Sequence, residues 1–199
     1  DLITKYPNTL DSNLRELFLL DKSKEQTIKQ EIADNEITVF MATYPGGFET
    51  VHKAVDSLLN QTLQVDRVIL HVNSDQSPNN LPNDPRLEVR LSETNEADNG
   101  KFKYMREYKG YFFTVDDDIC YPMDYVERMK SYVDHFNRQS IIGVHGAIFP
   151  FGPSISRWSQ YKEHRRTHTF TSANASFTQV NCLGTGTVAF HSQIGIPDY

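Results

Sequence analysis

Cysteine, tryptophan and long apolar runs are scarce in this sequence, and each shortage narrows the kind of protein that it encodes. There are two cysteines and one tryptophan in 199 residues. Cys120 and Cys182 have neither metal-binding nor redox spacing, which argues against a disulfide scaffold and favours a reducing compartment. No apolar run approaches the ~18 residues of a membrane-spanning helix, and the first residues do not resemble a signal peptide. We therefore expect a cytoplasmic protein, or one peripheral to the inner face of the membrane.

Basic residues are also fewer than acidic residues. Lys and Arg number 20 against 26 Asp and Glu, which gives a formal net charge of −6. Nucleic acid is bound by basic surfaces, so we expect no nucleic-acid partner. The length suits one domain with a substantial core. We expect a helical extension of two short helices over residues 1–35, followed by a single domain over residues 36–199.

One stretch joins a strong strand signal to a cluster of acids. The aromatic and β-branched run 111–115 is typical of a buried strand, and Asp116, Asp117 and Asp118 follow it directly. Three adjacent charges cannot enter a core, so the acids should lie where the strand ends, which is where open α/β sheets bind ligands. Asp116 and Asp118 would face one side and could share a divalent cation and its bound phosphates. The alternative is an acidic turn in which Asp118 caps the next helix.

The residues upstream of this stretch predict a βαβ unit. Residues 37–43 and 67–73 have the composition of buried strands, and residues 48–59 between them carry apolar residues at helical spacing. Such a unit implies a parallel strand pair with a right-handed crossover. The Tyr-Pro-Gly-Gly turn at 44–47 could present backbone N–H groups to a nucleotide, although such turns also form for steric reasons alone.

The rest of the chain predicts further elements and two groups of charged residues. Lys101 could contact a phosphate, pair with one of the acids, or lie at a solvated helix start. His145 is expected in the core. The basic group within 157–168, which contains one acid, is either a loop that meets an anion such as a diphosphate or a solvated face. The further elements are a strand at 87–91, a helix from about 101 to 108, a helix from Pro122 to 136, a strand at 141–149, and a Gly- and Thr-rich segment at 180–191.

In this order, the segments resemble the nucleotide-sugar-dependent glycosyltransferases of GT-A fold, especially the family-2-like enzymes that build bacterial capsule and surface polysaccharides. The resemblance implies an α/β, Rossmann-like fold with a mostly parallel mixed sheet flanked by helices. It also implies a UDP-sugar as donor, and Mn²⁺ or Mg²⁺ as cofactor. The matching segments are TVFMATYPGGFETVHKAVDSLLNQT (38–62), ADNGKF (97–102), GYFFTVDDDICYPMDYVERM (110–129), VHGAIF (144–149) and LGTGTVAFHS (183–192).

The resemblance also assigns roles to individual residues. Asp116 to Asp118 are similar to the DXD element of these enzymes, with Asp116 near the ribose and the metal, Asp117 in the nucleotide-binding set, and Asp118 a direct metal ligand. His191 stands where such enzymes add a metal or phosphate contact. The nucleotide pocket implied for this chain comprises Ala42, Thr43, Tyr44 and Asn73, with Asp98 and Lys101 facing the uracil or ribose and the phosphates.

Two departures from the family pattern qualify the resemblance. Gly46 and Gly47 stand where many relatives carry an Arg after the Pro. The general base of the family, an Asp on a helix after the Gly- and Thr-rich segment, falls beyond residue 199, so we expect the C-terminal part of the domain to be missing and the chain to bind donor and metal without complete catalysis. The sequence begins with Asp rather than Met, which we interpret as a trimmed start.

The function that the resemblance implies is metal-dependent, inverting transfer of a sugar to a glycan or lipid-linked acceptor in polysaccharide synthesis, alongside other domains of a larger protein. One alternative is a sugar-phosphate nucleotidyltransferase, but the Gly-rich loop with Arg and Lys that marks those enzymes is not found in ATYPGGFET. Another alternative is a non-catalytic nucleotide- or glycan-binding module of a larger polymerase.

Overall fold

The computed structural model describes residues 12–149, 165–169 and 176–196, and the chain divides into two compact units, Asp1–Asn35 and Glu36–Tyr199. In the part of the first unit that the structure describes, residues 12–35 form one continuous helix, α2 (Ser12–Asn35), where we expected two helices. Neither glycine nor proline interrupts this stretch, so nothing in its composition forces a break. No helix in the described residues is both long enough and apolar enough to cross a membrane.

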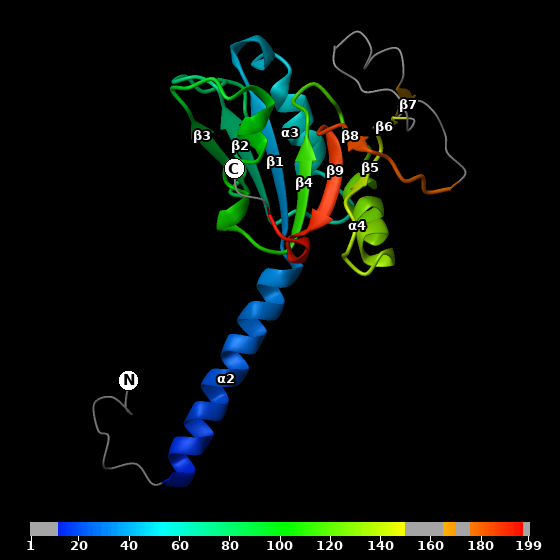
Figure 1. Cartoon of the computed structure of the whole chain (residues 1–199). Coiled ribbons are helices and arrows are strands. Elements are labelled where there is room, and N and C mark those ends of the chain that lie inside the picture. Colours follow the sequence, from blue (N-terminus) through cyan, green and yellow to red (C-terminus); the bar gives the residue numbers. More distant parts are fainter. Residues whose placement is uncertain (1–11, 150–164, 170–175, 197–199) are drawn as a thin grey trace. The chain divides into compact units, whose positions relative to one another are not determined.

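The second unit is built on a six-stranded sheet with strand order β3-β2-β1-β4-β9-β5 (Figure 1). β1 lies between β2 and β4 and is parallel to both, and β3 is parallel to β2. β9 runs antiparallel to β4 and to β5. The predicted α/β fold with a mostly parallel mixed sheet is therefore confirmed. The strands are β1 (Ile37–Thr43), β2 (Arg67–Val72), β3 (Leu87–Leu91), β4 (Tyr111–Val115), β5 (Ile142–Gly143) and β9 (Thr187–His191).

The two faces of this sheet are covered differently. Helices α3 (Val51–Leu59) and α4 (Tyr125–His135) pack their apolar residues on one face. Short 3-10 turns cover the other face, and Met105 of η3 contributes to its core with Phe40 and Phe112. A second, three-stranded sheet has the order β7-β6-β8. The remaining elements are η1 (Pro45–Gly47), η2 (Ala97–Lys101), η3 (Met105–Glu107), β6 (Gly146–Ile148), β7 (Arg166–His168), β8 (Cys182–Leu183) and η4 (Ser192–Ile194).

Three predicted elements differ from those observed. The helix expected from about residue 101 to 108 is replaced by the short 3-10 turns η2 and η3. Within η2, Gly100 lies against the His71 ring so closely that a Cβ would overlap it. Helix α4 begins three residues after Pro122, whose carbonyl accepts a hydrogen bond from the Tyr125 N–H at 3.0 Å. The strand expected over residues 141–149 is divided between β5 and β6, which belong to different sheets.

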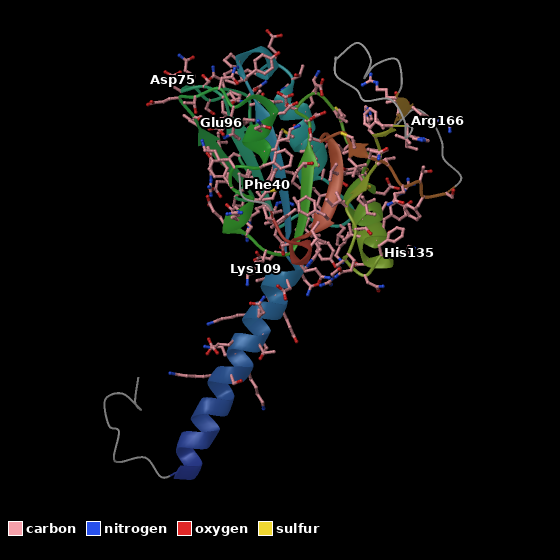
Figure 2. The ribbon with its side chains drawn as sticks, in the orientation of Figure 1. Phe40, Asp75, Glu96, Lys109, His135 and Arg166 are labelled. Carbon is pink, nitrogen blue, oxygen red and sulfur yellow. The ribbon has the colours of Figure 1, made fainter. Side chains whose placement is uncertain are left out.

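The parallel strands give the sheet two distinct ends. We call the end where β1, β2 and β4 finish the carboxyl end, and the end where they begin the amino end. In Figure 2, Asp75 and Glu96 lie toward the carboxyl end, whereas Lys109, just before β4, lies at the amino end. Loops that leave the carboxyl end of such sheets are the usual place for a ligand site.

Candidate functional site

Asp116, Asp117 and Asp118 leave β4 at the carboxyl end of the sheet. All five residues of β4 are buried, so these aspartates are the first positions after the strand at which a charge can reach water. Asp116 and Asp117 are half-buried, whereas Asp118 is exposed. The three carboxylates therefore differ in environment although they are adjacent in sequence.

The first carboxylate is paired with a buried lysine. The Lys101 side chain is 1% exposed, and its Nζ forms an ion pair with Asp116 Oδ1. Its second acidic neighbour, Asp98, is 82% exposed and lies 3.8 Å from the same Nζ. Turn η2, which carries Lys101, contacts β1. Near the end of β1, the small buried residue Ala42 is paired with His71 of β2. Of the roles considered for Lys101, pairing with an acid is the one observed.

The second carboxylate is held from the other face of the sheet. Thr43, the last residue of β1, donates its hydroxyl hydrogen bond to Asp117 Oδ2 at 2.5 Å. Gly47 of the Pro-Gly-Gly turn passes so close that a Cβ there would overlap Asp117 Oδ2 and lie 2.8 Å from Thr43 Oγ1. Burial raises the pKa of Asp117, the hydrogen bond from Thr43 opposes that shift, and the charge of Asp118 adds to it.

The third carboxylate is available to a ligand. Asp118 forms no hydrogen bond or ion pair with any residue that the structure describes. In the same described ranges, no group of three or more His, Cys, Asp and Glu side chains is arranged to hold a metal ion. Mg²⁺ is commonly bound by one or two carboxylates together with substrate phosphates and water. This donor set of hard oxygens fits that mode of binding and does not fit an enclosed protein cage.

Asn73 joins the ends of β1 and β2 to the loop before η2. Its backbone N–H donates to the Thr43 carbonyl at 2.8 Å, and its side-chain amide donates to the carbonyls of Thr43 and Ala97, each at 3.2 Å. Its Oδ1 accepts from the Glu96 N–H at 2.8 Å. Asn73 thus lies at the predicted site but forms most of its hydrogen bonds within the protein. Tyr44, at the start of the turn, is 57% exposed.

His191 is not brought to the aspartates. In the antiparallel β4–β9 pair, His191 is opposite Tyr111 and Thr187 is opposite Val115, so β9 carries His191 to the amino end. The length of β4 separates it from Asp116, roughly 16 Å at the usual rise per residue. The His191 ring packs edge-on against Tyr111 at 4.9 Å, and its Nδ1 accepts from the Gln193 N–H at 3.2 Å. The metal contact implied for His191 is therefore corrected, because the strand runs away from the site.

Two other predictions from the sequence concern the basic group within 157–168 and His145. Residues 157–164 of the basic group lie outside the described residues. His145 is not in the core, since it is only half-buried and lies in the short connection between β5 and β6.

Sequence reasoning missed two residues that shape the site, Tyr121 and His71. Tyr121 is buried, and its hydroxyl lies between the Asp116 N–H and the Gly186 carbonyl. His71 is buried in β2 with Nε2 at 3.2 Å from Asn73 Oδ1, and burial lowers the pKa of its imidazole while that hydrogen bond opposes the shift. These two residues come from separate segments of the chain, and no pattern within either segment predicts that it reaches the site.

A surface depression of about 650 Å³ lies near the same end of the sheet. It involves residues that follow η1 and residues that follow β2, and none of the three aspartates lines it. The aspartates are therefore not part of this depression. Its lining residues are Phe48, Glu49, Gln76, Ser77, Asn79 and Asn80.

Comparisons with known proteins give distant likenesses only. No protein-family model matches the chain, and no curated protein matches it. Among solved structures, S. aureus TarS 1–349 is 14% identical with a TM-score of 0.48, over 79% of this chain and 47% of that chain. The same fragment in complex with UDP-GlcNAc gives the same identity and TM-score over 45% of its length. The chain thus spans less than half of the TarS fragment, and we base the function on the site geometry and not on this likeness.

Proposed function

We propose that this chain forms the donor site of a metal-dependent glycosyltransferase, which transfers a sugar from a nucleoside diphosphate sugar to a glycan or lipid-linked acceptor. The donor is a UDP-sugar, the transfer is inverting, and the role is in polysaccharide synthesis, as the resemblance of the sequence segments implies. The observation that carries the proposal is the imbalance of charge at the carboxyl end of the sheet. Three carboxylates meet one buried ammonium group there, and the outermost carboxylate has no partner among the described residues.

The three carboxylates have separate roles in this proposal. Asp118 is the direct ligand of Mg²⁺ or Mn²⁺, because it is exposed. Asp116, whose charge Lys101 balances, lies beside the ribose and the metal. Asp117 joins the acidic turn to the end of β1 through Thr43. A divalent cation bound there supplies a Lewis acid that stabilises the diphosphate as it leaves.

The nucleotide would lie across the ends of β1 and β2. Ala42 and Thr43 form the floor at the end of β1, and exposed Tyr44 offers an aromatic ring beside it. Asn73 fixes the neighbouring strand end, and exposed Asp98 faces the uracil or ribose. A carboxylate that accepts the proton of the acceptor hydroxyl is also needed for transfer, and we assign no described residue to that role.

The test is calorimetric titration of UDP into the protein with Mn²⁺, repeated with EDTA and with Asp118→Ala. We expect binding that requires metal and that weakens at least tenfold in the variant, because a direct ligand of the cation is lost. Asp124→Ala is the matched control, since it removes an acid from the same loop whose partner, Arg128, is 3.5 Å away on the surface. That control should bind as the unaltered protein does.

The possible results separate the parts of the proposal. Metal-dependent binding of CDP or GDP in place of UDP would replace the uridine assignment and leave the metal site standing. Equal loss in Asp118→Ala and Asp124→Ala would indicate a general effect of charge and would contradict the ligand role of Asp118. Failure of every nucleoside diphosphate to bind with metal present would contradict the proposal as a whole.

A further inference from the structure

The hydroxyl of Tyr121 connects the acidic turn to β9. It accepts a hydrogen bond from the backbone N–H of Asp116 at 2.8 Å and donates one to the carbonyl of Gly186 at 2.6 Å. The Tyr121 side chain is buried, and burial raises the pKa of its hydroxyl, so it stays protonated and able to donate. One buried hydroxyl therefore links the first residue after β4 to the residue just before β9.

Gly186 lies directly against the carboxylate of Asp116. Val115 and Thr187 form the last pair of the antiparallel β4–β9 ladder, so Asp116 and Gly186 are the neighbouring residues just beyond it. A Cβ on residue 186 would overlap the Asp116 carboxylate, with Oδ1 still only 2.9 Å away. The absence of a side chain at this position is what lets the carboxylate occupy its place beside Lys101.

The position of Asp116 is thus set from three directions. Lys101 forms an ion pair with its carboxylate, Gly186 leaves the space that the carboxylate fills, and Tyr121 binds its backbone N–H. Side chains that must bind a ligand in one geometry are held by such supporting contacts. Conformational entropy that these side chains lose on folding is not lost again when the ligand binds.

We propose that Tyr121 and Gly186 are positioning residues for Asp116, which fix its carboxylate toward the metal and nucleotide and tie the acidic turn to β9. This inference rests on the proposed function, since it concerns how the same donor site is held in its binding geometry. It assigns no contact between Tyr121 and the ligand, because its hydroxyl is already engaged on both sides.

Tyr121→Phe is the direct test, and Tyr125→Phe is its matched control. The two ring centroids lie 4.8 Å apart and both side chains are buried, but the Tyr125 hydroxyl has no hydrogen-bond partner among the residues that the structure describes. Both variants remove one buried hydroxyl, and only the first frees the Asp116 backbone. We expect Tyr121→Phe to weaken UDP binding with Mn²⁺ about three- to tenfold, as one lost hydrogen bond to the backbone would, and Tyr125→Phe to leave it unchanged.

Measuring the affinity for Mn²⁺ distinguishes positioning of Asp116 by Tyr121 from a purely structural role of Tyr121. Free Mn²⁺ is followed by its electron paramagnetic resonance signal during titration at saturating UDP, and the melting temperature is recorded for each variant. Positioning of Asp116 predicts weaker Mn²⁺ binding in Tyr121→Phe under these conditions. Loss of stability with an unchanged Mn²⁺ affinity would contradict the inference.

Gly186→Ala provides a second variant should Tyr121→Phe fold poorly. The added methyl group must displace the Asp116 carboxylate, so we expect a larger loss of Mn²⁺ and UDP affinity, more than tenfold. Gly184→Ala is its control, because a Cβ there meets only the His145 ring at 3.3 Å or more. Equal effects of the two alanine variants would overturn the role of Gly186.

The results distinguish this inference from the proposed function. If the unaltered protein binds UDP with Mn²⁺ and Tyr121→Phe binds both equally well, the positioning inference is wrong while the donor site stands. If the unaltered protein binds neither, both are wrong.

Discussion

The two ends of β4 carry acids, cations and aromatic rings in different proportions. At the amino end, the Tyr111 hydroxyl donates to Asp134, and the same carboxylate pairs with Lys130 at 2.8 Å and with Arg138 at 3.3 Å. Both cations also lie over the Tyr111 ring, at 4.1 and 5.0 Å from its centroid. One carboxylate therefore has two cationic partners and a hydroxyl.

The carboxyl end has the opposite balance. Asp116 is paired with Lys101, Asp117 accepts one hydrogen bond from Thr43, and Asp118 has no partner among the described residues. A carboxylate cluster without enough counter-charge is unfavourable in the unliganded protein, and a divalent cation relieves it. Similar residue types therefore stabilise the fold where their charges balance and can form a binding site where they do not.

Replacing a lysine at each end of β4 should give the largest difference in the free energy of unfolding. Lys101→Met leaves the Asp116 carboxylate without its buried partner, and we expect a loss of about 2–3 kcal/mol, below the usual range for a broken buried pair because that carboxylate is 37% exposed. Lys130→Met should cost only about 0.5–1 kcal/mol, because Asp134 keeps Arg138 and Tyr111. Urea unfolding at pH 7 measures both.

A double variant checks the cause of the larger loss. In Lys101→Met with Asp116→Asn, the uncompensated charge is gone, so more than half of the lost stability should return. If the double variant is no more stable than Lys101→Met alone, the loss comes from packing of the lysine chain and not from the Asp116 charge.

Removing an acid at each end should give effects of opposite sign. Asp134→Asn weakens two ion pairs at a partly exposed site, and we expect a loss of about 1–2 kcal/mol. Asp118→Asn removes a negative charge beside two others, and we expect a gain of about 0.5 kcal/mol in EDTA. Thermal unfolding of the two variants without metal measures this, and a destabilised Asp118→Asn would contradict the surplus of negative charge.

Much of the fold could be predicted from the sequence because it depends on local patterns. Continuous apolar runs rich in β-branched and aromatic residues located β1, β2 and β4, and apolar residues at helical spacing located α3 and α4, each to within a few residues. The strand–helix–strand order implied the parallel pairing of β1 and β2. The place of the acids also followed from a local rule, since charges cannot continue a buried strand. These inferences needed no knowledge of distant partners.

The supporting contacts of the site could not be predicted, because they join residues far apart in sequence. The hydrogen bond from Thr43 to Asp117 and the fit of Gly186 against Asp116 depend on how β1, β4 and β9 are placed side by side. The same reason explains the error at His191, because the direction of β9 decides which end of the sheet its last residue reaches.

The stabilities that Asp117 and Asp134 contribute should depend on pH in opposite ways, with effects smaller than those of the substitutions above. Burial raises the pKa of Asp117, so its contribution to stability is complete below the unfolded value near 3.8 and is lost as the pH rises through its folded pKa. At Asp134, burial acts in the same direction, but the hydrogen bonds from Lys130 and Tyr111 outweigh it and lower the pKa. Its contribution is therefore complete above the unfolded value and is lost as the pH falls through its folded pKa.

Neutral amides at these two positions should change the pH profile in opposite ways. Asp117→Asn keeps an acceptor for Thr43 and should stabilise the protein at pH 7, with a difference that shrinks toward pH 3. Asp134→Asn should destabilise it at pH 7, and that difference should begin to shrink as the pH falls below the unfolded value near 3.8, because the carboxylate of the unfolded chain is protonated before the folded one. Urea midpoints between pH 3 and pH 8 in EDTA measure both differences. A difference for Asp117→Asn that stays constant over this range would mean that its carboxylate titrates alike in the folded and unfolded chain, and the electrostatic contrast between the two ends would then rest on Asp116 and Asp118 alone.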